Sequence, residues 1–181
     1  MELMVRCSMP DRPGELAKVA SAISAVGGDI QAVDVVEHSD DRALDDIELK
    51  LDADRIPSLL HRLSALDGVQ VVHAGPSRGH PGDAVTRLSI GIESLLDGSA
   101  EPRRGLLTLI GGQLRARSAE YVKYGDAPNG DLRALALDTG EEVLLIQRDY
   151  RFTSAERERA EALLRLALRA IATVHDADAV R

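Results

Sequence analysis

The residues best placed for chemistry form a short turn, Asp11-Arg12-Pro13-Gly14, which we call the 11–14 turn. Pro13 suits the first turn of a helix, because its φ is fixed and a helix start leaves the N–H that proline lacks unpaired anyway. Gly14 has no side chain to cover its backbone N–H, which would lie at the positive end of the helix dipole. Such an N–H can hold a carboxylate. A Pro-Gly pair is also typical of turns that bind nothing, and this alternative stays open.

The other reactive side chains do not form a catalytic or metal-binding pattern. The five histidines (38, 61, 73, 80 and 175) lack the spacings of zinc ligands, and the sequence has no phosphate-loop, dinucleotide or serine-nucleophile motif. Arg103-Arg104-Gly105 loosely resembles an acyl-CoA pyrophosphate loop, but no strand is expected before it. We therefore predict no enzyme activity, no metal and no cofactor.

Cys7 is the only cysteine, so the chain cannot form an internal disulfide. It alternates with Leu3, Val5 and Met9 on one face of an expected strand, which predicts a small core side chain. The first residues lack the basic start and apolar core of a signal peptide, and no apolar run could cross a bilayer. We therefore expect a cytoplasmic protein without a membrane partner.

Composition favours two folded units in the 181 residues. Hydrophobic residues make up 44% and aromatic residues only 2%, and all four aromatic side chains lie in the second half. Residues 1–77 hold 14 acidic against 7 basic side chains, and residues 78–181 hold 16 against 15. An acidic first half repels phosphate backbones, so we predict no nucleic-acid partner.

The first 75 residues alternate between strand and helix patterns. Period-two segments at 2–9, 29–38, 47–52 and 69–73 predict strands, and helical spacing predicts helices over 14–26 and 54–66. This order, β-α-β-β-α-β, predicts an α+β unit with both helices on one face of an antiparallel ferredoxin-like sheet. We expect Leu16, Val19, Ala20, Ile23 and Val26 to face that sheet. We expect the acidic pairs Asp40-Asp41 and Asp45-Asp46 to lie in a turn and on a wet strand edge.

Residues 76–83 are typical of a linker, and a second small α/β unit is expected over 84–175. Helices are predicted near 85–96 and 103–117, then strands over 119–124, 131–138 and 142–147, with turns at Asn129-Gly130 and Thr139-Gly140. Thr153 and Glu156 predict a capping box that opens a long last helix, and residues 176–181 are expected to be a tail.

The first unit resembles the ACT domain, a βαββαβ module that binds amino acids and regulates metabolic enzymes. The resemblance covers residues 1 to about 75 and rests on Asp11-Arg12-Pro13-Gly14, Leu16 and Gly28-Asp29-Ile30. It implies an amino-acid site in a seam between two subunits, made by two segments: Asp11, Arg12, Pro13 and Gly14 on one side and Gly28, Asp29, Ile30 and Gln31 on the other. The Gly14 N–H would hold the ligand carboxylate and Asp29 its ammonium. Many ligand-binding members have Asn at the position of Asp29, and ionised Asp serves only the cationic end.

The second unit is similar to a GAF domain, a sensory α/β module. The similarity covers about 84–174 and rests on the strand Glu142 to Gln147, then Phe152-Thr153 and Glu156. A full GAF domain has a longer middle that encloses its ligand. The resemblance therefore implies a reduced cavity and dimer-forming helices.

Three hypotheses follow for the function of the chain. In the first, a homodimeric regulatory protein senses a small amino acid. In the second, both units serve assembly without a ligand, as an interaction module for a metabolic enzyme or regulator. The third, an enzyme, would require Tyr121, Arg133 and Tyr150 to converge on one pocket.

Overall fold

The computed structural model describes residues 1–39, 41–77, 84–128 and 130–179. The chain divides into two compact units, Met1–Gly82 and Asp83–Arg181. Of the expected linker, residues 78–83 lie outside the described residues, as do Asp40 and Asn129 of two expected turns. Each unit is described separately below.

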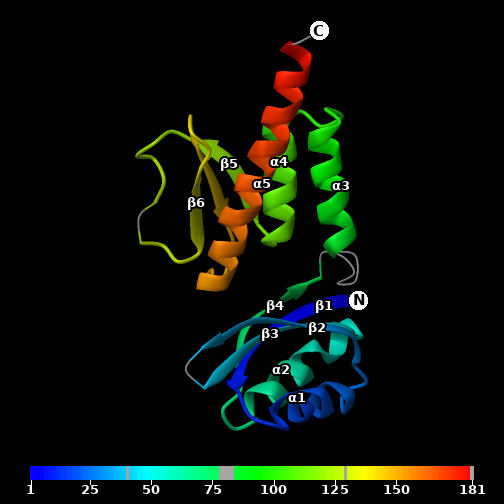
Figure 1. Cartoon of the computed structure of the whole chain (residues 1–181). Helices are drawn as coiled ribbons and strands as arrows, with labels where there is room; N and C mark the ends of the chain where they lie inside the picture. Colours follow the sequence, from blue (N-terminus) through cyan, green and yellow to red (C-terminus); the bar gives the residue numbers. More distant parts are fainter. Residues whose placement is uncertain (40, 78–83, 129, 180–181) are drawn as a thin grey trace. The chain divides into compact units, whose positions relative to one another are not determined.

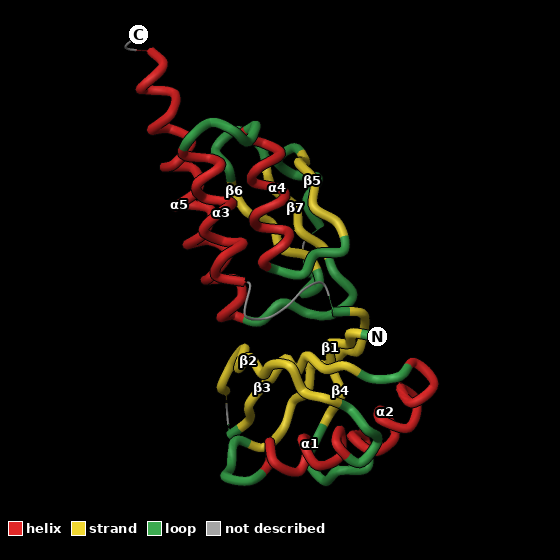
Figure 2. The backbone as a smooth tube through the Cα atoms, turned by 90° about the vertical axis from the view of Figure 1, so that its right-hand side faces the viewer, coloured by secondary structure: helices red, strands yellow, loops and turns green. Residues whose placement is uncertain are grey.

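The N-terminal unit is a four-stranded antiparallel sheet with two helices on one face (Figures 1 and 2). The strands are β1 (Glu2–Pro10), β2 (Asp29–Ser39), β3 (Arg42–Lys50) and β4 (Gln70–Pro76). The helices are α1 (Glu15–Ser24) and α2 (Ile56–Ser64), the latter preceded by a 3-10 turn, η1 (Ala53–Arg55). The strand order is β2-β3-β1-β4, so β2 and β4 are the edges. The predicted α+β class and ferredoxin-like βαββαβ order are confirmed.

The core of this unit lies between the helices and the sheet. Its members are aliphatic, as the near absence of aromatic residues requires, and the fully buried ones include Val5, Cys7, Val19, Ile23 and Ile47. Cys7 is the small core side chain that was expected, and burial raises the pKa of its thiol to about 12. A thiol held neutral in this way is a poor nucleophile.

Two expectations about this unit are wrong. Asp45 and Asp46 do not lie on a wet edge, because β3 is a central strand and both side chains are only 3% exposed. Asp46 forms a two-pronged ion pair with buried Arg6, with N–O distances of 2.6 and 2.8 Å. Leu16 does not join the core and is 39% exposed, since Glu15 takes the corresponding buried position at the start of α1.

The C-terminal unit contains three helices and a three-stranded antiparallel sheet of order β5-β7-β6. The helices are α3 (Ala84–Leu96), α4 (Pro102–Gln113) and α5 (Ser154–Ala179), and the strands are β5 (Ser118–Val122), β6 (Ala134–Asp138) and β7 (Val143–Gln147). The predicted order of elements is therefore confirmed. The helices α3 and α4 pack closely, because Gly91 lies against Leu109 and Gly105 lies against Leu95.

Two predictions concern the ends of α5: a capping box at its start and a tail after it. The capping box is confirmed: the Glu156 N–H donates to Thr153 Oγ1 at 3.1 Å, and the Thr153 N–H donates to Glu156 Oε2 at 2.9 Å. The tail expected from residue 176 is wrong as far as residue 179, where α5 ends. Residues 175–179 contain neither glycine nor proline, so nothing in them stops a helix. Residues 180–181 lie outside the described part of the chain.

Candidate functional site

The 11–14 turn leaves the start of α1 open. Gly14 has φ 93°, a left-handed conformation that side chains rarely adopt, and all four residues of the turn are exposed. No side chain caps α1, and a Cβ built on Gly14 would meet no atom within 4 Å. Gly14 is therefore exposed and uncrowded at the start of α1, while the Glu15 N–H donates to the Arg12 carbonyl at 3.3 Å. First-turn N–H groups without such a partner can hold a carboxylate.

Asp11 connects this turn to the far end of β2. Its backbone N–H donates to the Asp41 carbonyl at 2.7 Å, and its carboxylate lies 2.9 Å from Nδ1 of His38. The two side chains are 51% and 60% exposed, so the contact contributes at most about 1 kcal/mol. The turn is held in place mainly by its backbone, and the Asp11–His38 contact can open at little cost.

The second predicted segment lies where α1 ends and β2 begins. Gly27 has φ 80° and ends the helix. Gly28 is closely packed, because a Cβ there would come within 2.6 Å of Ile23 Cγ2 and 3.3 Å of Leu49 Cδ1. Asp29 is exposed and already accepts a hydrogen bond of 2.7 Å from Gln31 Nε2, while Ile30 is half-buried against the core.

Within one chain, the two predicted segments do not meet. The ten residues of α1 separate Gly14 from Gly28, and a helix of that length spans about 15 Å. The strand register shows the same separation, because Asp29 pairs with Lys50 at one end of β2 and Ser39 pairs with Arg42 at the other. One chain alone therefore cannot place both segments on one small ligand.

Two buried carboxylates near the start of α1 were not predicted. Oδ1 of Asp45 and Oε2 of Glu15 are inaccessible to solvent and have no hydrogen-bond partner among the residues that the structure describes. Burial raises the pKa of Asp45, with the charges of Asp11, Asp46 and Asp34 acting in the same direction and His38 opposing them. The alternation of β3 could have identified Asp45, since it places this residue on the face of Ile47 rather than that of Asp46.

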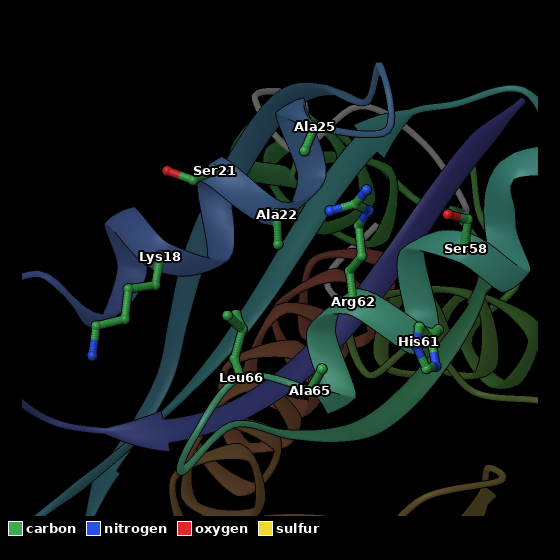
Figure 3. Close-up of a pocket in the computed structure, with 9 residues that line it drawn as sticks. All are labelled: Lys18, Ser21, Ala22, Ala25, Ser58, His61, Arg62, Ala65 and Leu66. Carbon is green, nitrogen blue, oxygen red and sulfur yellow. The ribbon is translucent and has the colours of Figure 1, made fainter.

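Two open grooves lie on this unit. The larger one, about 790 Å³, runs between α1 and α2 and carries the cationic side chains Lys18 and Arg62, together with His61 (Figure 3). Its lining contains no carboxylate and is exposed throughout except at Ala22 and Leu66, which are half-buried. The smaller groove, about 410 Å³, includes Gly27, Asp29 and Lys50 at the start of β2. Neither groove includes a residue of the 11–14 turn.

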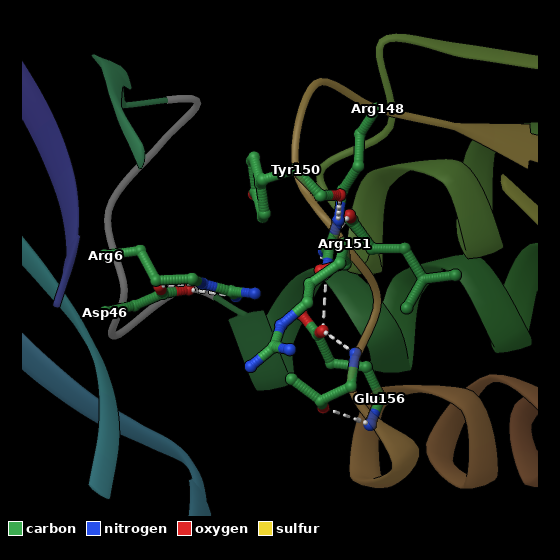
Figure 4. Close-up of polar contacts among 8 residues, drawn as sticks. Arg6, Asp46, Arg148, Tyr150, Arg151 and Glu156 are labelled. Carbon is green, nitrogen blue, oxygen red and sulfur yellow. Dashed lines mark hydrogen bonds and ion pairs between the residues drawn. The ribbon is translucent and has the colours of Figure 1, made fainter. Parts of the chain in front are cut away.

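The enzyme hypothesis concerned Tyr121, Arg133 and Tyr150 of the C-terminal unit, and each of these side chains has contacts in the described structure. Tyr121 donates to the Arg103 carbonyl at 3.2 Å and lies beneath the Arg103 guanidinium, whereas Arg133 pairs with Asp131. Tyr150 lies beneath Arg148, at 4.1 Å from the ring centre to Cζ (Figure 4). These side-chain contacts of Tyr121, Arg133 and Tyr150 are thus to different partners, although the Arg148 N–H also donates to the Arg133 carbonyl at 3.1 Å.

The start of α4 is closed to an anion. The Glu101 carboxylate caps this helix and accepts from the N–H groups of Arg103 and Arg104, at 3.0 and 2.8 Å. A pyrophosphate at Arg103-Arg104-Gly105 would have to displace this carboxylate. Among the described residues, no group of three or more His, Cys, Asp or Glu could hold a metal ion, and no helix has the length and apolar character needed to cross a membrane.

The two glycines of the predicted site should respond differently to substitution. Gly28→Ala should lower the free energy of unfolding by about 1–3 kcal/mol, because the new methyl overlaps Ile23 and the half-buried site is closely packed. Gly14→Ala has open space and should cost about 1–2 kcal/mol through its left-handed φ alone. Urea unfolding followed by circular dichroism, with structures of both variants, separates the causes: displacement of Ile23 is expected only in Gly28→Ala.

No family model matches the sequence, and no curated protein matches it. Among solved structures, a protein of unknown function from Galdieria sulphuraria is similar, with 12% identity, a TM-score of 0.38 and coverage of 94% of this chain and 93% of that one. The regulatory subunit of aspartate kinase from Thermus thermophilus has 15% identity, a TM-score of 0.36 and coverage of 93% and 91%. An uncharacterized protein from Thermotoga maritima has 22% identity and a TM-score of 0.35, over 42% of this chain and 96% of that one. These scores do not assign the chain to a family.

Proposed function

We propose that this chain is a regulatory protein that binds a small amino acid at the 11–14 turn of its N-terminal unit. The observation that carries the proposal is the open start of α1: an exposed turn, a left-handed glycine and a helix without a side-chain cap. Unpaired N–H groups at the positive end of a helix favour a carboxylate. Acidic side chains near the start of α1, including Asp11 and buried Asp45, suit the ammonium group of the same ligand.

A second copy of the chain would explain how the two predicted segments serve one ligand. Since they lie at opposite ends of β2, a two-fold axis beside this edge strand would place residues 28–31 of one copy near the 11–14 turn of the other. The outer edge of β2 is eleven residues long and carries exposed Val33 and Val35. An unpaired edge with apolar side chains is a favourable surface for strand pairing. The proposal therefore includes a homodimer joined along β2.

Thermal unfolding of the full chain with each proteinogenic amino acid in turn tests the proposed function. At least one amino acid should raise the melting temperature in a dose-dependent manner, because a ligand that binds only the folded state stabilises it. The matched controls are the corresponding compounds without the ammonium or without the carboxylate, which should have little effect. A screen in which no amino acid changes the melting temperature would exclude amino-acid sensing.

The alternative function is ligand-free assembly, in which the chain is an interaction module for a metabolic enzyme or regulator. The exposed valines of β2 favour this function as much as they favour the sensor, since both need the edge to be paired. The two functions differ in the screen: the module should dimerise with the same affinity whether amino acids are present or absent. Sedimentation equilibrium with and without the amino acids therefore separates them.

A further inference from the structure

Asp45 is the strongest chemical anomaly in the N-terminal unit. It pairs with Cys7 in the β1–β3 ladder, so its side chain shares the helix-facing side of the sheet with the core residue Ile47. The residue is 3% exposed, and its Oδ1 has no hydrogen-bond partner in the described part of the chain. An ionised carboxylate is strongly disfavoured in an apolar layer unless a cation or donors accompany it. Oδ1 of Asp45 is therefore a buried acceptor to which none of the described residues donates.

This acceptor lies behind the contact between the 11–14 turn and β2. His38 pairs with Ala43, two residues from Asp45 on the same face of β3, and so its side chain projects to the same side of the sheet. Asp11 approaches His38 from the turn, at 2.9 Å, and both contribute to the electrostatic environment of Asp45. Because the Asp11–His38 contact is exposed, it can open and give a ligand access to Asp45.

We infer that Asp45, rather than Asp29, accepts the ammonium group of the amino acid whose carboxylate is held at the 11–14 turn. The inference rests on the proposed function and assigns its second contact. Asp29 is a weaker candidate in either copy of the proposed dimer, since its carboxylate is exposed to water and already accepts from Gln31. Asp45 is at the end where α1 begins, and the nearby charges of Asp11, Asp34 and Asp46 add to the attraction for a cation.

The test is a calorimetric titration of the full chain and three variants. The probe is whichever proteinogenic amino acid gives the largest thermal stabilisation of the unmodified chain. Asp45→Asn should weaken binding roughly ten- to a hundredfold, the loss expected for a hydrogen bond to a charged group. Asp67→Asn, the matched control, changes an exposed carboxylate outside both predicted segments and should leave the affinity unchanged. Asp45→Ala serves as a second variant, because a buried asparagine could itself lack partners.

A ligand-free measurement checks that the carboxylate lacks a partner. The raised pKa means that the folded chain keeps the Asp45 proton at a pH where the unfolded chain has lost it, so ionisation destabilises the fold as pH rises. The neighbouring His38 side chain opposes this rise in the pKa of Asp45, and Asp11, Asp34 and Asp46 reinforce it. The melting temperature of Asp45→Ala minus that of the unmodified chain should therefore be more positive at neutral pH than at acidic pH.

The outcomes separate this inference from the proposed function. If no amino acid binds the unmodified chain, both fail. If an amino acid binds and the Asp45 variants bind it equally well, only the role of Asp45 is overturned. The same holds if Asp67→Asn loses as much affinity as the Asp45 variants. The role of Asp45 is also overturned if the melting temperature of Asp45→Ala, minus that of the unmodified chain, is lowest at neutral pH. Asp45 would then already have a stabilising partner.

Discussion

Replacing Glu156 by alanine should lower the free energy of unfolding of the C-terminal unit by about 3–5 kcal/mol, because it leaves the Arg148 guanidinium buried without its counter-ion. Arg148 donates to both oxygens of Glu156, at 2.8 and 2.5 Å, and the side chains are 1% and 7% exposed. Figure 4 shows the pair beside Tyr150 and Arg151. The same glutamate closes the capping box of α5, so one substitution removes two stabilising contacts.

The Arg148 guanidinium also holds three chain segments together. It donates to the carbonyls of Leu114, Tyr150 and Arg151 at 2.8–3.1 Å, and it lies over the rings of Tyr150 and Phe152. These contacts join the ends of α4 and β7 to the start of α5. We therefore expect the substitution to weaken the whole unit cooperatively rather than to fray a single helix.

Tyrosine fluorescence can follow this unfolding, because all three tyrosines lie in the C-terminal unit and the chain has no tryptophan. The control is Arg117→Ala, which breaks an exposed ion pair with Asp149 and should change stability by less than about 1 kcal/mol. Equal urea midpoints for Glu156→Ala and the unmodified chain would show that the buried pair does not stabilise the unit.

The double substitution Val33→Lys with Val35→Lys should convert the proposed dimer to a monomer. The two valines are 38% and 45% exposed on edge strand β2, and charges on such an edge oppose its pairing with a second copy. The same variant should lose the thermal response to amino acids, because the segments at opposite ends of β2 would no longer meet. Sedimentation velocity measures the first effect and thermal unfolding the second.

The other edge of the sheet supplies the control for this experiment. Val72 lies on β4 and is 36% exposed, so Val72→Lys adds a charge to an edge strand without touching β2. It should leave both dimerisation and the amino-acid response unchanged. A β2 variant that remains dimeric, or a Val72 variant that dissociates, would place the subunit contact elsewhere.

Local patterns in the sequence predicted the helices and strands well, and predicted less well which side chains are buried. The alternation of residues 2–9 and 47–52 gave β1 and much of β3, and Thr153 with Glu156 gave the start of α5, since these signals depend only on near neighbours. Alternation assigns side chains to two faces but does not say whether the second face is wet. The burial of Arg6 and Asp46 depends on pairing across 40 residues, which the pattern of either strand alone does not contain.

In the candidate site, too, features set by neighbouring residues were predicted and features set by strand pairing were missed. That Gly14 is exposed followed from the local chemistry of proline and glycine. Its left-handed φ did not, because the helix was expected to begin at residue 14 and begins at Glu15. Asp45 could not be associated with this turn from the sequence, because the association depends on the register of β3 against β1 and β2. Leu16 was misplaced because helical spacing alone did not show that Glu15 would be buried in its stead.

Isothermal titration of the full chain with amino acids tests the central claim most directly. We predict saturable binding of at least one amino acid, and a large loss of affinity when the same compound lacks either its ammonium or its carboxylate group. Binding that persists without the carboxylate would contradict the role of the exposed amide at Gly14. If no amino acid gives a saturable heat, the chain does not sense amino acids.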